Sequence, residues 1–170
     1  MGIQLSNKIN VELEWIEKIF FYNLLEDFYT ADNEDKWEDF DDKYWQILDN
    51  DFIYYMFLKE DEVLYIGRTG IKTIIFNRWF DHRHQVIPRI MFSYPKPEQI
   101  KITVARIENI STNKRTRQYL DTIERILIEE SNPLFNKRKG EIIYSYREKF
   151  TIINKGDFEP LRKKYTVKFD

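Results

Sequence analysis

The chain of 170 residues contains no cysteine, which excludes disulfide bridges and zinc sites built from thiolates. Glycine and proline are scarce, with five residues of each, and no run of about 18 apolar residues could cross a membrane as a helix. The start of the chain also lacks the basic-then-apolar layout of a secretory signal. These absences predict a cytoplasmic protein without a membrane partner.

Charge is divided unevenly along the chain, although the net charge is only −2. Residues 1–52 carry four Lys/Arg against fourteen Asp/Glu, a balance of −10, whereas residues 53–170 carry twenty-three against fifteen, a balance of +8. A basic body favours a polyanionic partner, because phosphate contacts supply most of the non-specific affinity for nucleic acid. The acidic balance of residues 1–52 needs a separate explanation.

Apolar periodicity predicts the main elements of a single compact domain with an appendage. An amphipathic helix is expected over 9–30 and a second, shorter helix over 35–48. Alternating residues predict a strand over 100–106, and the longest helix is expected over 113–131, before Asn132-Pro133. The tail from residue 141 alternates in short pieces that predict two or three small strands.

The predicted helix over 35–48 has one face that is acidic, formed by Glu38, Asp39, Asp41 and Asp42. Such a face is usually solvated and would then only pad the core. Alternatively, it mimics DNA phosphates and shields a basic groove or binds a partner protein. Both explanations stay open.

A hairpin organises the chain: an apolar run over 52–58 and a second run over 63–66 flank a charged turn. The second run stops at Gly67, and a helical pattern follows a short loop. Tyr54 and Tyr65 are eleven positions apart, so we expect the two phenols to meet on one face of the hairpin.

Several residues form an ordered set: Ile53-Tyr54, Tyr65-Ile66-Gly67, Arg78 followed by His82, Glu124, and Asn136 twelve residues later. This set resembles the motifs of the GIY-YIG nuclease superfamily. Two departures accompany the resemblance: Phe52 stands where the first motif has glycine, and the loop between Gly67 and Arg78 is about three residues longer than in compact members.

The resemblance implies an α/β fold in which a small central antiparallel β-sheet is flanked by helices. The nuclease-like core would cover residues 52–138. An acidic helical extension over residues 1–51 would precede it, and a basic, β-rich tail over residues 139–170 would pack on it.

Glu124 is the most telling candidate for chemistry, because it lies in or beside the apolar stripe of the predicted helix over 113–131. A carboxylate there is costly to bury unless it is paired or binds a metal. A salt bridge to Arg117 or Arg125 would satisfy it structurally. The resemblance instead implies a ligand for Mg²⁺, or Mn²⁺, which one carboxylate and several waters can hold.

Five other side chains are candidates; four receive roles from the resemblance, and Arg68 receives one from its place directly after Gly67. Arg78 would offset the charge that develops on the phosphate. Tyr54 would be the general base and Tyr65 its helper, with Arg68 lowering the phenol's pKa. His82 would contact phosphate or carry a proton, whereas a metal site of neighbouring Asp and His residues is disfavoured, because adjacent helix positions do not converge.

By the same resemblance, Asn136 would brace the site through hydrogen bonds. A track for DNA phosphates is predicted from the basic residues near both ends of the predicted helix over 113–131. These residues are Lys114, Arg115, Arg117, Lys137, Arg138 and Lys139.

The sequence therefore predicts a Mg²⁺-dependent endonuclease that hydrolyses phosphodiester bonds of double-stranded or branched DNA. Restriction, mobile-element transfer or phage-related DNA processing would be its setting. The alternative is a non-catalytic nucleic-acid-binding or regulatory module that keeps the fold, which Phe52 favours because a bulky residue could crowd the start of the strand.

Overall fold

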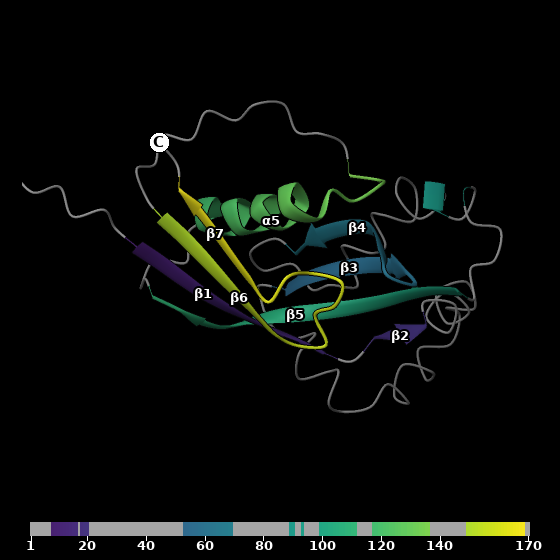
Figure 1. Cartoon of the computed structure of the whole chain (residues 1–170), viewed down its shortest axis with the longest axis horizontal. Helices are drawn as coiled ribbons and strands as arrows, with labels where there is room; N and C mark the ends of the chain where they lie inside the picture. The colour runs from purple at the N-terminus through teal and green to yellow at the C-terminus, as the bar shows by residue number, and fades with distance from the viewer. Residues whose placement is uncertain are drawn as a thin grey trace, which may run out of the picture.

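The computed structural model describes residues 8–16, 18–20, 53–69, 89–90, 93, 99–111, 117–136 and 149–168. These residues form one seven-stranded sheet and one complete helix (Figure 1). The elements are β1 (Lys8–Trp15), β2 (Ile19–Phe20), β3 (Ile53–Lys59), β4 (Glu62–Arg68), β5 (Ile100–Ile110), α5 (Arg117–Ser131), β6 (Lys149–Gly156) and β7 (Lys164–Lys168).

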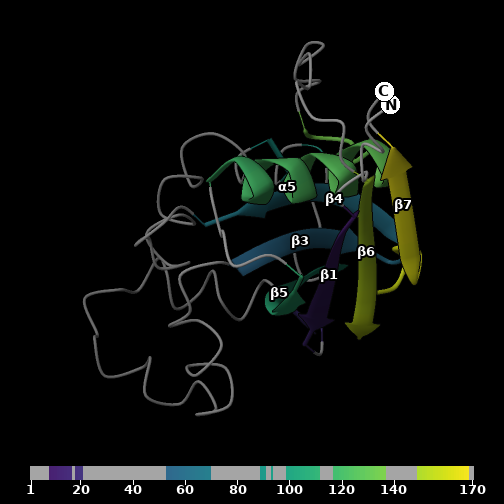
Figure 2. The same cartoon turned by 90° about the vertical axis from the view of Figure 1, so that its left-hand side faces the viewer.

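The strands follow the order β4-β3-β5-β1-β6-β7, with β2 also pairing with β5. Every pairing is antiparallel except that of β1 with β6, which joins the two ends of the chain in parallel. Figure 2 shows the six-strand path curling as a half-barrel around one face of α5. Strands from both ends of the chain and from its middle therefore share one sheet.

The core fills the space between this curled sheet and α5. The helix buries Leu120, Ile123 and Leu127, whose spacing of three and four residues forms an apolar stripe. Asn132 ends the helix in the left-handed conformation, with φ 47°, and its backbone NH donates to the Ile128 carbonyl at 2.8 Å. Pro133 then prevents the helix from continuing.

The predicted fold of a small sheet flanked by helices is wrong. The described chain is mostly β-sheet, and α5 lies within the curl of that sheet instead of flanking it. The helix predicted over 9–30 is also wrong where the structure describes it, because residues 8–15 are β1 and residues 19–20 are β2. β1 alternates buried and more exposed side chains, the period of a strand with one face on the core.

The locally encoded elements are confirmed. β3 and β4 form the predicted hairpin, β5 contains the predicted strand over 100–106 and extends to Ile110, and α5 covers most of the predicted helix over 113–131. In the tail, β6 and β7 pair as an antiparallel hairpin. The predicted helix over 35–48, with its acidic face, lies outside the described residues.

The expectation that Tyr54 and Tyr65 meet on one face of the hairpin is wrong, because a β-bulge changes the register. Near the turn Leu58 pairs with Val63, but beyond the bulge Phe57 pairs with Tyr65. In a regular ladder Tyr65 would have paired with Met56, on the same face as Tyr54. One extra residue on β4 thus moves Tyr65 to the opposite face.

No helix among the described residues is long and apolar enough to cross a membrane.

Candidate active site

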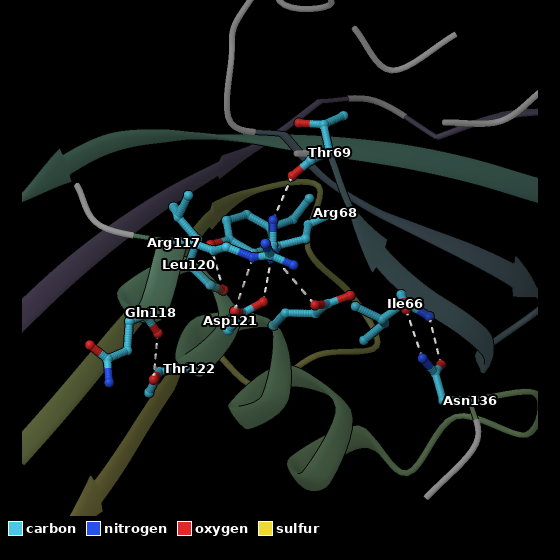
Figure 3. Close-up of polar contacts among 11 residues, drawn as sticks. Ile66, Arg68, Thr69, Arg117, Gln118, Leu120, Asp121, Thr122 and Asn136 are labelled. Atoms are coloured by element: carbon cyan, nitrogen blue, oxygen red, sulfur yellow. Dashed lines mark hydrogen bonds and ion pairs between the residues drawn. The ribbon is translucent and has the colours of Figure 1, made fainter. Parts of the chain in front are cut away.

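Three sequence-distant elements meet where β4 ends against the first turns of α5 (Figure 3). Tyr54 comes from β3, Arg68 from the last position of β4, and Glu124 from the second turn of α5. Tyr54 and Arg68 are opposite each other in the hairpin register, so both side chains point toward the helix. We call Tyr54, Arg68, Asp121 and Glu124 the helix-facing cluster.

Arg68 is the centre of this cluster, with only 12% of its side chain exposed. One terminal nitrogen donates to the Thr69 carbonyl at 2.8 Å, and the other donates to the Asp121 carboxylate. The Arg68 Nε lies 3.3 Å from a Glu124 carboxylate oxygen, an ion pair without a hydrogen bond of good geometry. The guanidinium is therefore held between two carboxylates of the same helix.

The charges around Arg68 keep it firmly protonated. Burial by itself lowers the pKa of the guanidinium, but the hydrogen bond to Asp121 and the negative charges of Glu124 and Asp121 outweigh that effect and raise the pKa. A permanent cation thus lies beside Glu124, which is buried with 8% exposure.

Tyr54 is protonated in this environment. Its ring is 1% exposed, and its hydroxyl donates to the Leu120 carbonyl at 3.2 Å. Burial raises the pKa of the phenol well above its ordinary value; Arg68 opposes this shift, while Glu124 and Asp121 add to it. Arg68 therefore lowers this pKa as expected, but desolvation outweighs its effect, so the net shift is upward and the pKa of the phenol is not lowered.

Tyr65 lies on the other face of the sheet, away from the cluster. Its ring is 6.2 Å from that of Tyr55 and 6.3 Å from that of Phe57, measured between centroids. A shared catalytic step with Tyr54 is therefore not possible in this arrangement.

Gly67, the last residue of the second motif, is required by packing on this same face. It pairs with Tyr55, and a Cβ atom built on Gly67 would lie 2.5 Å from the Tyr55 ring. Tyr55 is completely buried, so its ring has little room to move. The absence of a side chain at Gly67 leaves room for the Tyr55 ring to lie across β4 at the position before Arg68.

Asn136 holds the edge of β4 through its side-chain amide. Its Nδ2 donates to the Ile66 carbonyl at 2.8 Å, and its Oδ1 accepts from the Ile66 NH at 2.9 Å. The preceding Phe135 NH donates to the Leu64 carbonyl at 2.8 Å, so the segment after α5 continues the sheet for a short distance. These bonds fix the backbone of β4 at Ile66, two residues before Arg68.

Asp121 is the member of the cluster that sequence reasoning missed. It lies one turn before Glu124, is 48% exposed at its side chain, and also faces Arg117 at 3.9 Å. Its spacing of three residues from Glu124 was the available signal. Arg117, predicted as a phosphate contact, has 80% of its side chain exposed at the rim.

The remaining predicted residues lie outside the described part of the chain. They are Arg78, His82, Lys114, Arg115, Lys137, Arg138 and Lys139.

Glu124 and Asp121 offer hard carboxylate oxygens, the donor type that Mg²⁺ prefers. The described residues contain no group of three or more Asp, Glu, His or Cys side chains that could enclose a metal. Both carboxylates already face the Arg68 guanidinium, so any ion at Glu124 would have to share this carboxylate with Arg68.

A hollow of the described surface lies away from this cluster. It has a volume of about 790 Å³ and lies between the β3–β4 turn and the carboxyl end of α5. Glu60, Asp61, Glu62 and Glu130 are among its lining residues, and carbonyl groups at a helix end add negative potential. Lys59 and Arg162 also line the hollow, but the four acids outnumber them, so the hollow is less favourable for an anionic substrate.

Comparison with protein-family models, with curated proteins and with solved structures found no match to this chain.

Proposed function

We propose that the protein is a Mg²⁺-dependent endonuclease that hydrolyses phosphodiester bonds of double-stranded or branched DNA. One observation carries the proposal: residues that the GIY-YIG resemblance selects from distant parts of the sequence converge in space. Tyr54, Glu124 and Asn136 span 82 positions, yet Tyr54 and Glu124 share the helix-facing cluster and Asn136 braces its β4 side. A buried carboxylate with a specific charge partner is a candidate functional group.

Each described residue receives a role from its contacts. Glu124 would hold the ion, and Mg²⁺, when bound, would polarise the scissile phosphate and stabilise the leaving oxygen. Arg68 would offset negative charge on the phosphate, because its guanidinium is fixed by Asp121 and Thr69. Arg78, outside the described residues, keeps its proposed role as a second planar cation.

Tyr54 would position α5 and not accept a proton. Its hydroxyl donates to the Leu120 carbonyl, one turn before Glu124, and its raised pKa leaves no base at neutral pH. Asn136 would hold the end of β4 and therefore Arg68. This division of roles replaces the assignment of Tyr54 as general base.

Plasmid nicking by the Glu124→Gln variant tests the proposal. With Mg²⁺ present, the variant should lose at least about 10²-fold in rate, because glutamine cannot supply the carboxylate charge. Glu129→Gln is the matched control, since Glu129 lies on the same helix with 52% of its side chain exposed. EDTA should abolish cleavage by the wild type. Nicking by Glu124→Gln at the wild-type rate would overturn the assignment.

A second candidate function is a non-catalytic nucleic-acid-binding or regulatory module. The fully buried, protonated Tyr54 favours it, because the residue that the family resemblance marks as a base is not available as one. Binding of duplex DNA by the wild type, without nicking in Mg²⁺ or Mn²⁺, would select this alternative.

A further inference from the structure

The outer face of the curled sheet carries a row of three lysines at one end. Lys8 on β1 pairs with Lys149 on β6, and Lys149 pairs with Lys168 on β7. Residues paired across a sheet point to the same face, and neighbouring strands are about 4.8 Å apart. Their neighbours along the strands, including Ile9 and Phe150, are buried in the core. The three ammonium groups therefore project away from α5 from adjacent positions; we call them the lysine row.

The lysine row is left without opposite charge by the described chain. Lys8 and Lys168 are exposed, Lys149 is half-buried, and none of the three forms an ion pair with a described residue. The outward acids of β1, Glu12 and Glu14, lie further along the strand, and Glu12 binds Lys155 at 3.1 Å. Like charges placed directly opposite each other on a sheet destabilise it. An anion that spans the row would relieve this repulsion.

The next positions on this face are polar. Asn10 pairs with Thr151, and Thr151 pairs with Thr166; Asn10 and Thr166 are exposed. Amide and hydroxyl groups beside lysines are typical donors to phosphate and sugar oxygens. A lipid surface would instead require large apolar side chains among the cations, and the one exposed large hydrophobic residue of the described chain, Leu134, follows the far end of α5.

One core contact joins the start of β6 to the first turn of α5. The Tyr119 ring packs 5.9 Å from the Phe150 ring, measured between centroids. Tyr119 precedes Leu120, the acceptor for Tyr54, and Phe150 follows Lys149.

We propose that the lysine row binds the phosphate backbone of duplex DNA on the outer face of the sheet. The choice of DNA as the polyanion rests on the proposed function, whereas the row itself does not depend on catalysis. This surface lies outside the stretch that resembles GIY-YIG nucleases, so the C-terminal hairpin gains a role of its own.

Binding of a labelled duplex of about 30 base pairs by the full chain, in EDTA and over a salt series, tests this inference. In the Lys8→Gln/Lys149→Gln/Lys168→Gln variant, affinity at about 0.1 M salt should fall by at least about 10-fold. The slope of log affinity against log salt should shrink by about 2 to 3, because each lost phosphate contact removes about 0.9.

The matched control removes three lysines elsewhere, Lys59→Gln/Lys101→Gln/Lys163→Gln, and should change the slope by less than about 1. A variant with arginine at the three row positions should keep wild-type binding. Thermal unfolding checks integrity: Tm of the glutamine variant should equal or exceed that of the wild type, since repulsion is relieved.

Equal slopes for the row and control variants would overturn the inference, as would tighter binding to vesicles of phosphatidylserine than to DNA. Because no metal is present, loss of binding is separate from loss of cleavage. A wild type that binds through the row but does not nick would reject only the endonuclease.

Discussion

The ion pair between Arg68 and Glu124 should contribute far more to stability than the Arg125–Glu129 pair of the same helix, in which the arginine is equally buried but the carboxylate is half exposed. Both side chains are largely buried, at 12% and 10% exposure, and the joining atoms are 3.3 Å apart. At an effective dielectric constant of about 20, the attraction is about 5 kcal/mol. Desolvation of the two ions offsets part of this, so we expect a coupling of about 2–3 kcal/mol.

Urea unfolding of Arg68→Met, Glu124→Gln and the double variant measures that coupling as a double-mutant cycle. Methionine keeps most of the arginine's length, so the cycle chiefly reports charge. The slope of the free energy of unfolding against urea should stay constant across the four proteins, which confirms that only stability has changed.

Arg125 and Glu129 provide the matched pair on α5. Their contact is shorter, at 2.5 Å, but 52% of the Glu129 side chain is exposed. A pair of this type, four residues apart on a helix, contributes about 0.3–0.5 kcal/mol. If the two cycles gave the same coupling, burial would not be what strengthens the Arg68–Glu124 pair, and the reasoning would be refuted.

Three further predictions concern the neighbours of the cluster. Above pH about 10 the free energy of unfolding of the wild type should fall as pH rises. The loss is up to about 1.4 kcal/mol per pH unit for each tyrosine whose pKa is raised in the folded state, because the unfolded chain releases the phenol proton at a lower pH. Tyr54→Phe should flatten this loss while Tyr165 retains its share, as urea unfolding across that pH range would reveal. Gly67→Ala should cost about 1–3 kcal/mol, because the added methyl meets the buried Tyr55 ring; an unchanged urea midpoint would contradict this packing. Asn136→Ala should lower the free energy of unfolding by about 1–3 kcal/mol, because it leaves the NH and carbonyl of Ile66 unpaired. Asn136→Asp loses only the amide donor, so its stability in the same assay should lie between those of Asn136→Ala and the wild type.

Local pattern in the sequence determined the elements whose partners are close along the chain. β3 and β4 are separated by a two-residue turn, and an apolar stripe followed by Asn132-Pro133 predicts α5 and its end. The sequence also identified Glu124 as a carboxylate among apolar residues, and its burial confirms that observation. These features depend on period and on nearest neighbours, which the sequence displays directly.

Tertiary structure alone decided the rest. Apolar and polar residues alternate strictly in β1, but a longer apolar pattern that extends past residue 16 resembled a helix. The partner strands that hold β1 extended, β5 and β6, lie about 95 and 140 residues away in the sequence. A single bulge between Phe57 and Leu58 placed Tyr65 on the opposite face from Tyr54. Packing between α5 and the sheet buried the Tyr54 phenol and raised its pKa, and no spacing in the sequence states how deeply a side chain is buried. Register and burial arise from contacts between distant segments, so they appear only once the chain is folded.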